Sequence, residues 1–251
     1  PHASSSAASD VYKRQALLQA AKRDHRQLVS TDLGFAVGPR INAAGRLDDM
    51  SLGIECLLTD DFNRAVDIAS ELDAFNRDRR QIEQAMQGEA LVLLERMDTG
   101  PAEGYGVCLY HSEWHQGVIG ILASRIKERL HRPVIAFARG ENGEIKGSAR
   151  SISGLHIRDA LDRVDRMAPG LIVKFGGHAM AAGLTLAAGT FERFRSLFDE
   201  VCQSMLSEDA LQQTLDTDGV LNAADFNMAL AEALRLGGPW GQDRLFLSRS
   251  S

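Results

Sequence analysis

The longest regular pattern in the chain lies between Phe62 and Met97, where apolar residues recur at steps of three and four with charged residues between them. This spacing puts the apolar side chains on one face and predicts a long amphipathic helix. Its middle, Asn76 to Arg80, is too polar to be buried on every side. A long helix that is covered on only part of its surface is typical of a connection between two domains. The stretch "DTGPAEG", residues 98–104, ends the pattern because glycine and proline interrupt helices.

After this break the pattern changes to short apolar runs that alternate with amphipathic ones. Residues 105–110 and 133–138 are apolar runs of strand length, and residues 117–130 between them have helical spacing. A strand, a helix and a second strand in this order predict a parallel pair. Further segments continue the alternation: a strand at 143–150, a helix at 155–164, a strand at 181–187 and a helix at 190–206. We therefore expect an α/β fold in which a long connecting helix leads into a mixed α/β lobe with helices packed on the sheet.

The flanking segments are less regular. Residues 16–23 and 51–59 predict short helices, the second capped by the acidic pair Asp48 and Asp49. Residues 32–49, "DLGFAVGPRINAAGRLDD", predict a loop punctuated by glycine and proline. Beyond Ser207 the pattern is thinner and predicts one helix within residues 223–236.

Composition narrows the class of protein. The chain has 251 residues, of which 44% are hydrophobic and 25% charged, as in an ordinary globular protein. No run approaches the roughly 18 consecutive apolar residues of a membrane span, so we expect no membrane partner. Three widely separated cysteines favour a reducing, cytoplasmic location over a disulfide framework. The net charge of −6 does not exclude nucleic acid, since phosphate binding depends on where the basic residues lie. Residues 1–15 and 243–251 join no pattern, and we interpret both as non-native extensions.

Two segments carry side chains suited to phosphate. Arg40, Asn42 and Arg46 share the expected loop with glycines, and a guanidinium can bind phosphate oxygens in pairs. An equally weighted alternative pairs these arginines with a local carboxylate such as Asp48 or Asp49. His115 and Gln116 follow a strand and begin a helix, where they could present donors to an anion. Zinc binding by His111 and His115 lacks a third ligand at useful spacing.

Two further segments have the same character. Lys146, Ser148 and Arg150 alternate along an expected strand and would share one face, which suits a phosphate; a solvated strand face is the alternative. In "KFGGHAMAAG", residues 174–183, the N–H groups of Gly176 and Gly177 could hold an anion beside Lys174 and His178. A tight turn with an ordinary histidine is the alternative there.

These residues make no catalytic centre by themselves. The sequence has no nucleophile elbow, no Walker loop and no zinc spacing. Nor does it show the set of carboxylates and histidines that two-metal phosphoryl chemistry needs. The chain has the character of the binding half of an enzyme.

The blocks "DLGFAVGPRINAAGRLDDMS", "YHSEWHQGVIGILASRIKERLHRPVIAFA", "KGSARSISGLHIRDAL" and "KFGGHAMAAGL" resemble, in this order, those of the RecJ family of single-stranded-DNA-specific exonucleases in the DHH phosphoesterase superfamily. The resemblance runs from about residue 16 to about residue 242. It implies that residues 16–61 are the end of a DHH lobe, 62–100 a connecting helix, 101–207 a DHH-associated lobe, and 208–242 the start of a region leading to an oligonucleotide-binding domain. The Mn²⁺ or Mg²⁺ ions of the family would be bound by the missing DHH lobe, with no metal site in this segment.

The resemblance also implies a function and residue roles. The intact protein would degrade single-stranded DNA from 5′ to 3′ in DNA repair and recombination, alongside repair proteins such as a helicase or a single-strand-binding protein. Arg40 would approach the phosphate near the scissile bond, Ser148 and Arg150 the 5′ end, and His178, with Gly176 and Gly177, would support catalysis across from the metal site. The chain alone would be inactive. The alternatives are a phosphodiesterase of the same superfamily acting on short oligonucleotides or cyclic dinucleotides, and a non-catalytic nucleic-acid-binding module.

Overall fold

A computed structural model describes residues 15–24, 26, 28–95, 104–140, 143–213, 217–237 and 246–249. The chain divides into two compact units within the helix α5 (Phe62–Glu95): one is residues 80–213, and the other comprises the residues before and after it. The helix pattern read from the sequence therefore predicts α5 well. The expected break at 98–104 falls largely outside the described residues, as do most of the two expected extensions and of the segment 237–242.

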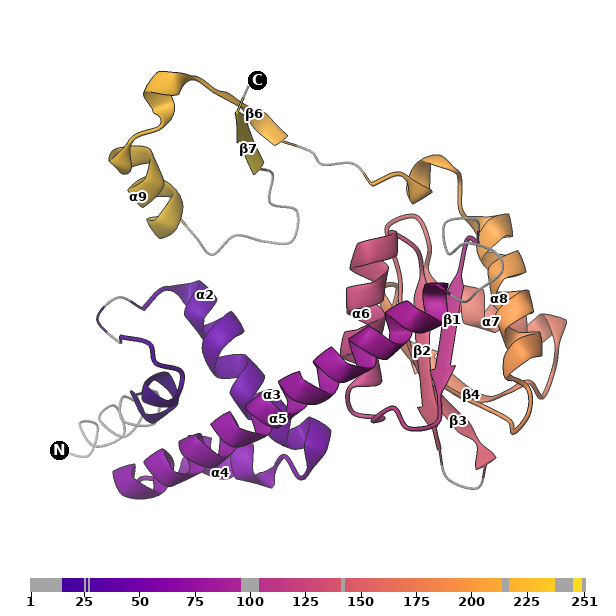
Figure 1. Ribbon diagram of the computed structural model, residues 1–251, viewed down its shortest axis with the longest axis horizontal. Coiled ribbons are helices and arrows are strands. Elements are labelled where there is room, and N and C mark those ends of the chain that lie inside the picture. Colours follow the sequence, from indigo (N-terminus) through magenta and orange to yellow (C-terminus); the bar gives the residue numbers. More distant parts are fainter. Residues whose placement is uncertain are drawn as a thin grey trace. The chain divides into compact units, whose positions relative to one another are not determined.

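The first unit contains a helical cluster packed on the first half of α5. Its elements are α2 (Ser30–Asp32), the π-helical turn η2 (Leu33–Val37), α3 (Gly38–Leu47) and α4 (Ser51–Leu58), shown in indigo and purple in Figure 1. Small and aliphatic side chains form its core: Ala16, Leu17, Ala44, Cys56, Ala65, Ile68, Ala69 and Leu72. Alanines at these positions let helices approach closely, so this unit is held together by close helix packing.

The loop expected at residues 32–49 is wrong, because most of this segment is helical. Pro39 stands in the first turn of α3, directly after the π-helical turn η2, which runs into α3 without a break. Ala43 and Ala44 are completely buried. A Cβ at Gly45 would lie 3.1 Å from the sulfur of Met50, so this glycine serves packing and does not end the helix.

The second unit is a mixed sheet with helices on both faces. Its strands are β1 (Val107–His111), β2 (Val134–Arg139), β3 (Ile145–Arg150), β4 (Ile172–Gly177) and β5 (Ala181–Leu186), in the order β1-β2-β3-β5-β4. The pair β1–β2 is parallel, as the sequence predicts, and the other pairs are antiparallel. Helix α6 (Ile119–Leu130) contacts β2 and β3, whereas α7 (Ile157–Met167) and α8 (Phe191–Met205) lie on the other side of the sheet (Figure 1). The expected α/β class is therefore confirmed.

The core of this unit lies between the sheet and the pair α7–α8. It contains alternate residues of β3 and β5, namely Ile145, Ala149, Ala182, Leu184 and Leu186. Because neighbouring residues of a strand point to opposite faces, the residues between them point toward the α6 side. Two contacts fix the second half of α5 in this unit: Trp114 Nε1 donates to Glu89 Oε2 at 2.8 Å, and Arg125 Nε lies 3.2 Å from Glu83 Oε1.

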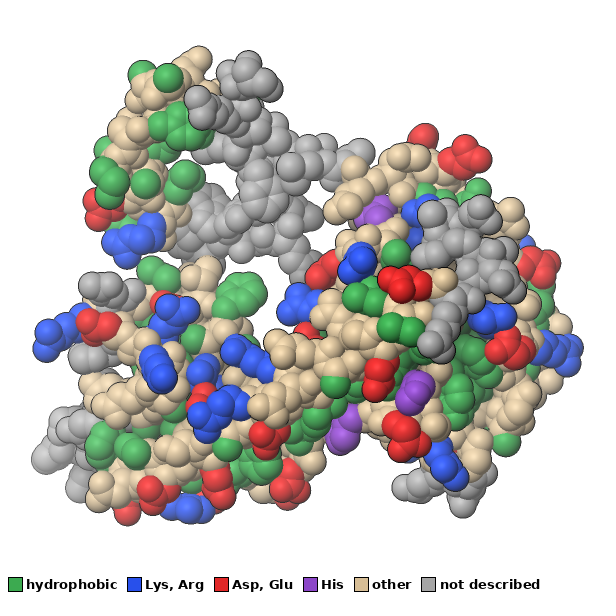
Figure 2. All heavy atoms as spheres, in the orientation of Figure 1, with side chains coloured by type: hydrophobic (Ala, Val, Ile, Leu, Met, Phe, Trp, Pro, Cys, Tyr) green, Lys and Arg blue, Asp and Glu red, His purple; other side chains and the backbone are tan. Residues whose placement is uncertain are grey.

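The C-terminal residues form separate small elements. Strand β6 (Thr217–Leu221) pairs in parallel with β7 (Phe246–Arg249), and α9 (Met228–Leu236) lies between them in sequence. Met228 is 82% exposed and Leu236 60%. Figure 2 shows several hydrophobic side chains (green) on the surface of the α9 segment. Within the described ranges, no helix is both long and apolar enough to cross a membrane.

The three cysteines provide a test of this packing. Cys56, Cys108 and Cys202 are at most 2% exposed, and burial raises the pKa of each thiol. We expect a thiol reagent at pH 8 to modify none of them quickly in the native chain and all three in denaturant. An unfolded thiol titrates near pH 8.5, whereas the buried thiols stay protonated to higher pH. The free energy of unfolding should therefore be unaffected by these thiols below about pH 8.5 and should fall above it, where the unfolded chain loses their protons. Rapid native modification of even one thiol would contradict the packing.

Candidate nucleic-acid interface

The polar residues of β3 form one row on the α6 side of the sheet. Lys146, Ser148 and Arg150 are half-buried there, while their neighbours Ile145, Gly147 and Ala149 are buried. Nη1 of Arg150 donates to Ser148 Oγ at 3.0 Å and to the Ala149 carbonyl at 2.8 Å. The guanidinium therefore lies beside the hydroxyl, and together they can offer several N–H and O–H donors to one anion.

Glycines continue this row across the sheet. Ser148 pairs with Gly183 of β5, and Gly183 pairs with Gly176 of β4. A Cβ at either glycine would meet nothing within 4 Å, so the surface there is bare backbone. A ligand can approach such a surface more closely than one covered by side chains.

Cations stand on both sides of this glycine row. Two residues along β3 in one direction, Arg150 pairs with Ala181 of β5. Two residues in the other direction, Thr185 of β5 pairs with Lys146 of β3 on one side and with Lys174 of β4 on the other. Register positions on one face are about 6.6–6.8 Å apart along the strands. We call Lys146, Ser148, Arg150, Lys174, Gly176 and Gly183 the cationic face. Its positive charge and its bare glycine backbone suit the phosphates of an extended nucleic-acid strand.

Gly177, the neighbour of Gly176 in the sequence, has a structural role. Gly177 has φ +153°, and a Cβ on it would lie 2.4 Å from the Ala181 carbonyl oxygen and 2.5 Å from the Ala182 Cα. The β4–β5 reversal therefore requires glycine here for its own backbone. His178 follows; its N–H donates to the Ala181 carbonyl at 2.8 Å, and its side chain is exposed. Among the described residues, no hydrogen bond holds its imidazole, which can turn toward a ligand.

His115 and Gln116 lie on the surface before α6 and are partly used by local contacts. Nε2 of Gln116 donates to the Arg139 carbonyl at 2.8 Å, which ties this turn to the end of β2. Nδ1 of His115 accepts from the Gly117 N–H at 3.1 Å. Both residues order the start of α6, and only Nε2 of the His115 ring is left to meet a ligand.

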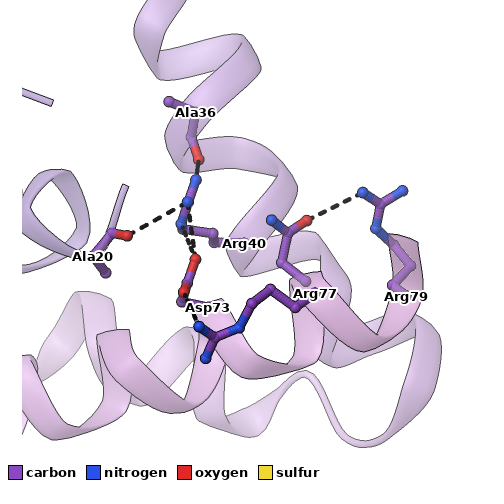
Figure 3. Close-up of polar contacts among 7 residues, drawn as sticks. Ala20, Ala36, Arg40, Asp73, Arg77 and Arg79 are labelled. Atoms are coloured by element: carbon purple, nitrogen blue, oxygen red, sulfur yellow. Dashed lines mark hydrogen bonds and ion pairs between the residues drawn. The ribbon is translucent and has the colours of Figure 1, made fainter. Parts of the chain in front are cut away.

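Arg40 belongs to the first unit, on α3, and has firm partners there (Figure 3). Its guanidinium lies 2.9 Å from Asp73 Oδ1 on α5, and its Nη1 donates to the Ala36 carbonyl at 2.6 Å. Asp73 also lies 3.5 Å from Arg77. The carboxylate partner is thus Asp73, and not the neighbouring Asp48 or Asp49 that sequence spacing suggests. On the same helix, Asn42 is exposed and Arg46 half-buried.

The Arg40–Asp73 pair makes a stability prediction. Their side chains are only 11% and 18% exposed, so Asp73→Ala would leave a charge that water solvates poorly. We expect this variant to lose about 2–3 kcal/mol of unfolding free energy, between the values for surface and buried pairs. Urea denaturation would measure it. Asp78→Ala, at an exposed position of the same helix, is the matched control and should stay within about 0.5 kcal/mol of the parent. Equal losses of unfolding free energy in Asp73→Ala and Asp78→Ala would show that the ion pair between Arg40 and Asp73 does not stabilise the fold.

The described residues do not suit a divalent metal ion. No group of three or more histidine, cysteine, aspartate or glutamate side chains gathers anywhere among them. A Mn²⁺ or Mg²⁺ site needs several such ligands around one point. The donors that the described residues do gather, on the cationic face, are of the kind that bind an anion such as phosphate.

Comparison with known proteins shows what this chain is similar to. Residues 103–204 match the DHHA1 domain model, and these bounds contain the whole cationic face. The chain is 56% identical over 229 residues to the single-stranded-DNA-specific exonuclease RecJ of Salmonella typhimurium and 55% identical over 232 residues to that of Escherichia coli. This chain is a homologue of RecJ. Each alignment covers 91% of this chain and 40% of the relative, so the chain spans about two fifths of the length of the RecJ proteins it matches.

Solved RecJ structures agree with the fold. RecJ in complex with Mn²⁺ from Thermus thermophilus is 29% identical and superposes with a TM-score of 0.77, covering 94% of this chain and 34% of that one. RecJ in complex with Mg²⁺ from the same organism is 32% identical, with a TM-score of 0.66 over 78% of this chain and 29% of that one. Both share the mixed α/β architecture of this RecJ homologue.

Sequence reasoning missed two residues of these sites. Gly183 was not singled out, although it completes the glycine row beside Ser148. The alternation of residues along β5 indicates which face of the sheet Gly183 lies on. It does not predict that Gly183 pairs with Ser148. Asp73 was missed as the partner of Arg40 because the two are 33 positions apart.

Proposed function

We propose that this chain is the phosphate-positioning part of a single-stranded-DNA-specific 5′→3′ exonuclease of DNA repair and recombination. The observation that carries the proposal is the cationic face, which lies entirely within the DHHA1 match of a RecJ homologue. A basic strip beside bare backbone can bind any extended strand through its phosphates, without regard to base sequence. Mn²⁺ or Mg²⁺ would be bound by parts of the protein outside this chain.

Each part of the face has a role in this proposal. Arg150 and Ser148 bind the 5′-terminal phosphate, because a guanidinium and a hydroxyl can donate to several of its oxygens. Lys146 and Lys174 hold following phosphates while the strand lies across Gly183 and Gly176. His178, directly after β4, would donate to a phosphate near the reaction, with Gly177 fixing its backbone.

The other site residues have supporting roles. Arg40, held by Asp73, would contact the phosphate next to the scissile bond, with Asn42 and Arg46 on the same helix. His115 and Gln116 would steady the turn before α6. We further propose a cytoplasmic location, where chromosomal DNA is accessible, and cooperation with a helicase or a single-strand-binding protein that exposes single strands.

Activity measurements on two proteins test the proposed function. The chain by itself should show no Mn²⁺-dependent degradation of single-stranded DNA, because positioning cannot replace the metal ions. The same chain, exchanged for the aligned segment of the E. coli RecJ, should degrade long single strands from the 5′ end. Nuclease activity of the pure isolated chain would contradict the proposal that this chain positions phosphate while other parts of the protein bind the metal ions. Faster turnover of dinucleotides than of long strands by the exchanged protein would contradict the substrate.

Salt dependence checks the lysine contacts. Each phosphate contact adds about 0.7 to the slope of log affinity against log salt for single strands, so Lys174→Ala should lower that slope by about 0.7. Affinities for an oligothymidylate at several salt concentrations would give the slope. Arg158→Ala removes one charge from α7, on the other side of the sheet, and should leave the slope unchanged. Equal slopes for Lys174→Ala and the parent would exclude a phosphate contact at Lys174.

A further inference from the structure

Gly120 lies in the first turn of α6 and is buried against β3. A Cβ at this position would lie 2.8 Å from Arg150 Nη2, 3.0 Å from Ser148 Oγ and 3.6 Å from Arg150 Cζ. Distances below 3.0 Å are shorter than side-chain carbons tolerate, so only a hydrogen atom fits between the helix backbone and the guanidinium. Gly120 thus touches both donor groups assigned to the 5′-terminal phosphate.

The guanidinium of Arg150 is confined from two directions. On the sheet side, its Nη1 is held by Ser148 Oγ at 3.0 Å and by the Ala149 carbonyl at 2.8 Å. On the helix side, its Nη2 rests against Gly120. A methyl group at residue 120 would push Nη2 away, and because both nitrogens belong to one planar group, the Nη1 contact with Ser148 would be lost as well.

We propose that Gly120 is a positioning residue that sets the place of Arg150 and Ser148, and thereby the preference for a 5′-phosphate over a 5′-hydroxyl. This inference rests on the proposed function of that pair. The atoms that a methyl group would displace are the far ends of flexible side chains, and no backbone atom is among them. The change should therefore move the donors without unfolding the unit. Alanine is also the better helix former, so the helix itself gains from the substitution.

The test compares Gly120→Ala with a matched control, Gly88→Ala. Gly88 also lies in a helix of the same unit, but a Cβ there would meet nothing within 4 Å. The readout is the ratio of affinities of the 251-residue chain for one oligothymidylate bearing a 5′-phosphate or a 5′-hydroxyl. We expect Gly120→Ala to reduce this ratio about tenfold and Gly88→Ala to leave it unchanged. In the double variant with Arg150→Ala, Gly120→Ala should add much less than its tenfold effect in the parent, because it acts mainly through Arg150.

The outcomes separate this inference from the proposed function. A parent chain without preference for the 5′-phosphate, unaffected by Arg150→Ala, would contradict the proposed function. A preference that Arg150→Ala abolishes and Gly120→Ala leaves intact would overturn only the role of Gly120. A full tenfold further loss in the double variant would also overturn it, since that would show an effect that does not pass through Arg150.

Discussion

Replacing Gly177 by alanine is expected to destabilise the 80–213 unit by about 3 kcal/mol or more, through backbone strain and overpacking combined. Its φ of +153° is one that residues with a Cβ rarely adopt, and the Cβ would overlap the backbone of Ala181 and Ala182. Backbone atoms of a paired strand cannot swing aside as the tip of a long side chain can. The β4–β5 pairing would therefore have to open at its end.

Gly176→Ala is the matched control for this prediction. The two glycines are neighbours in sequence, but a Cβ at Gly176 would meet nothing within 4 Å. Its unfolding free energy should stay within about 0.5 kcal/mol of that of the parent. Thermal and urea denaturation of both variants would measure the difference. Similar stabilities for the two variants would show that Gly177 does not have the backbone geometry described here.

Replacing Arg150 by alanine is expected to reduce the preference for a 5′-phosphorylated strand by about 10- to 100-fold, the range for charge-assisted hydrogen bonds. The guanidinium lies beside the Ser148 hydroxyl and can bind two phosphate oxygens at once. Arg150→Lys should recover only part of the loss, because an ammonium group cannot make that paired contact.

Two controls make the Arg150 result specific. Affinity for the strand with a 5′-hydroxyl should change much less than affinity for the phosphorylated strand. Arg158→Ala, which removes the same charge from α7, should change neither. Equal losses on both strands in Arg150→Ala would indicate a general electrostatic contact and would exclude recognition of the 5′-terminal phosphate by this arginine.

Local patterns predicted much of this fold. The three- and four-residue spacing placed α5 almost to its ends, and alternation along β3 put Lys146, Ser148 and Arg150 on one face. Both results depend only on the periodicity of a single element. The loop expected at residues 32–49 is wrong, because proline and glycine do not break the helix there. In the fold, Pro39 stands in the first turn of α3 and Gly45 packs inside that helix.

Features that depend on pairing between distant segments could not be predicted. Gly176 and Gly177 look equivalent in the sequence, and only the β4–β5 register and the backbone angle of Gly177 separate the open surface position from the structural one. Likewise, the contact of Gly120 with Arg150 joins a helix and a strand that are 30 positions apart. No local pattern encodes such contacts, because they arise from how whole elements pack.

The most direct test of the cationic face is a titration of the ¹⁵N-glycine-labelled chain with a 5′-phosphorylated oligothymidylate, followed by NMR. The chain has 23 glycines, which sample both sides of the sheet. If DNA binds as proposed, the amide signals of Gly120, Gly176 and Gly183 shift, while those of Gly88 and of Gly170 after α7 stay in place. Shifts confined to Gly88 and Gly170, or spread evenly over all glycines, would contradict a DNA-binding face on β3, β5 and β4.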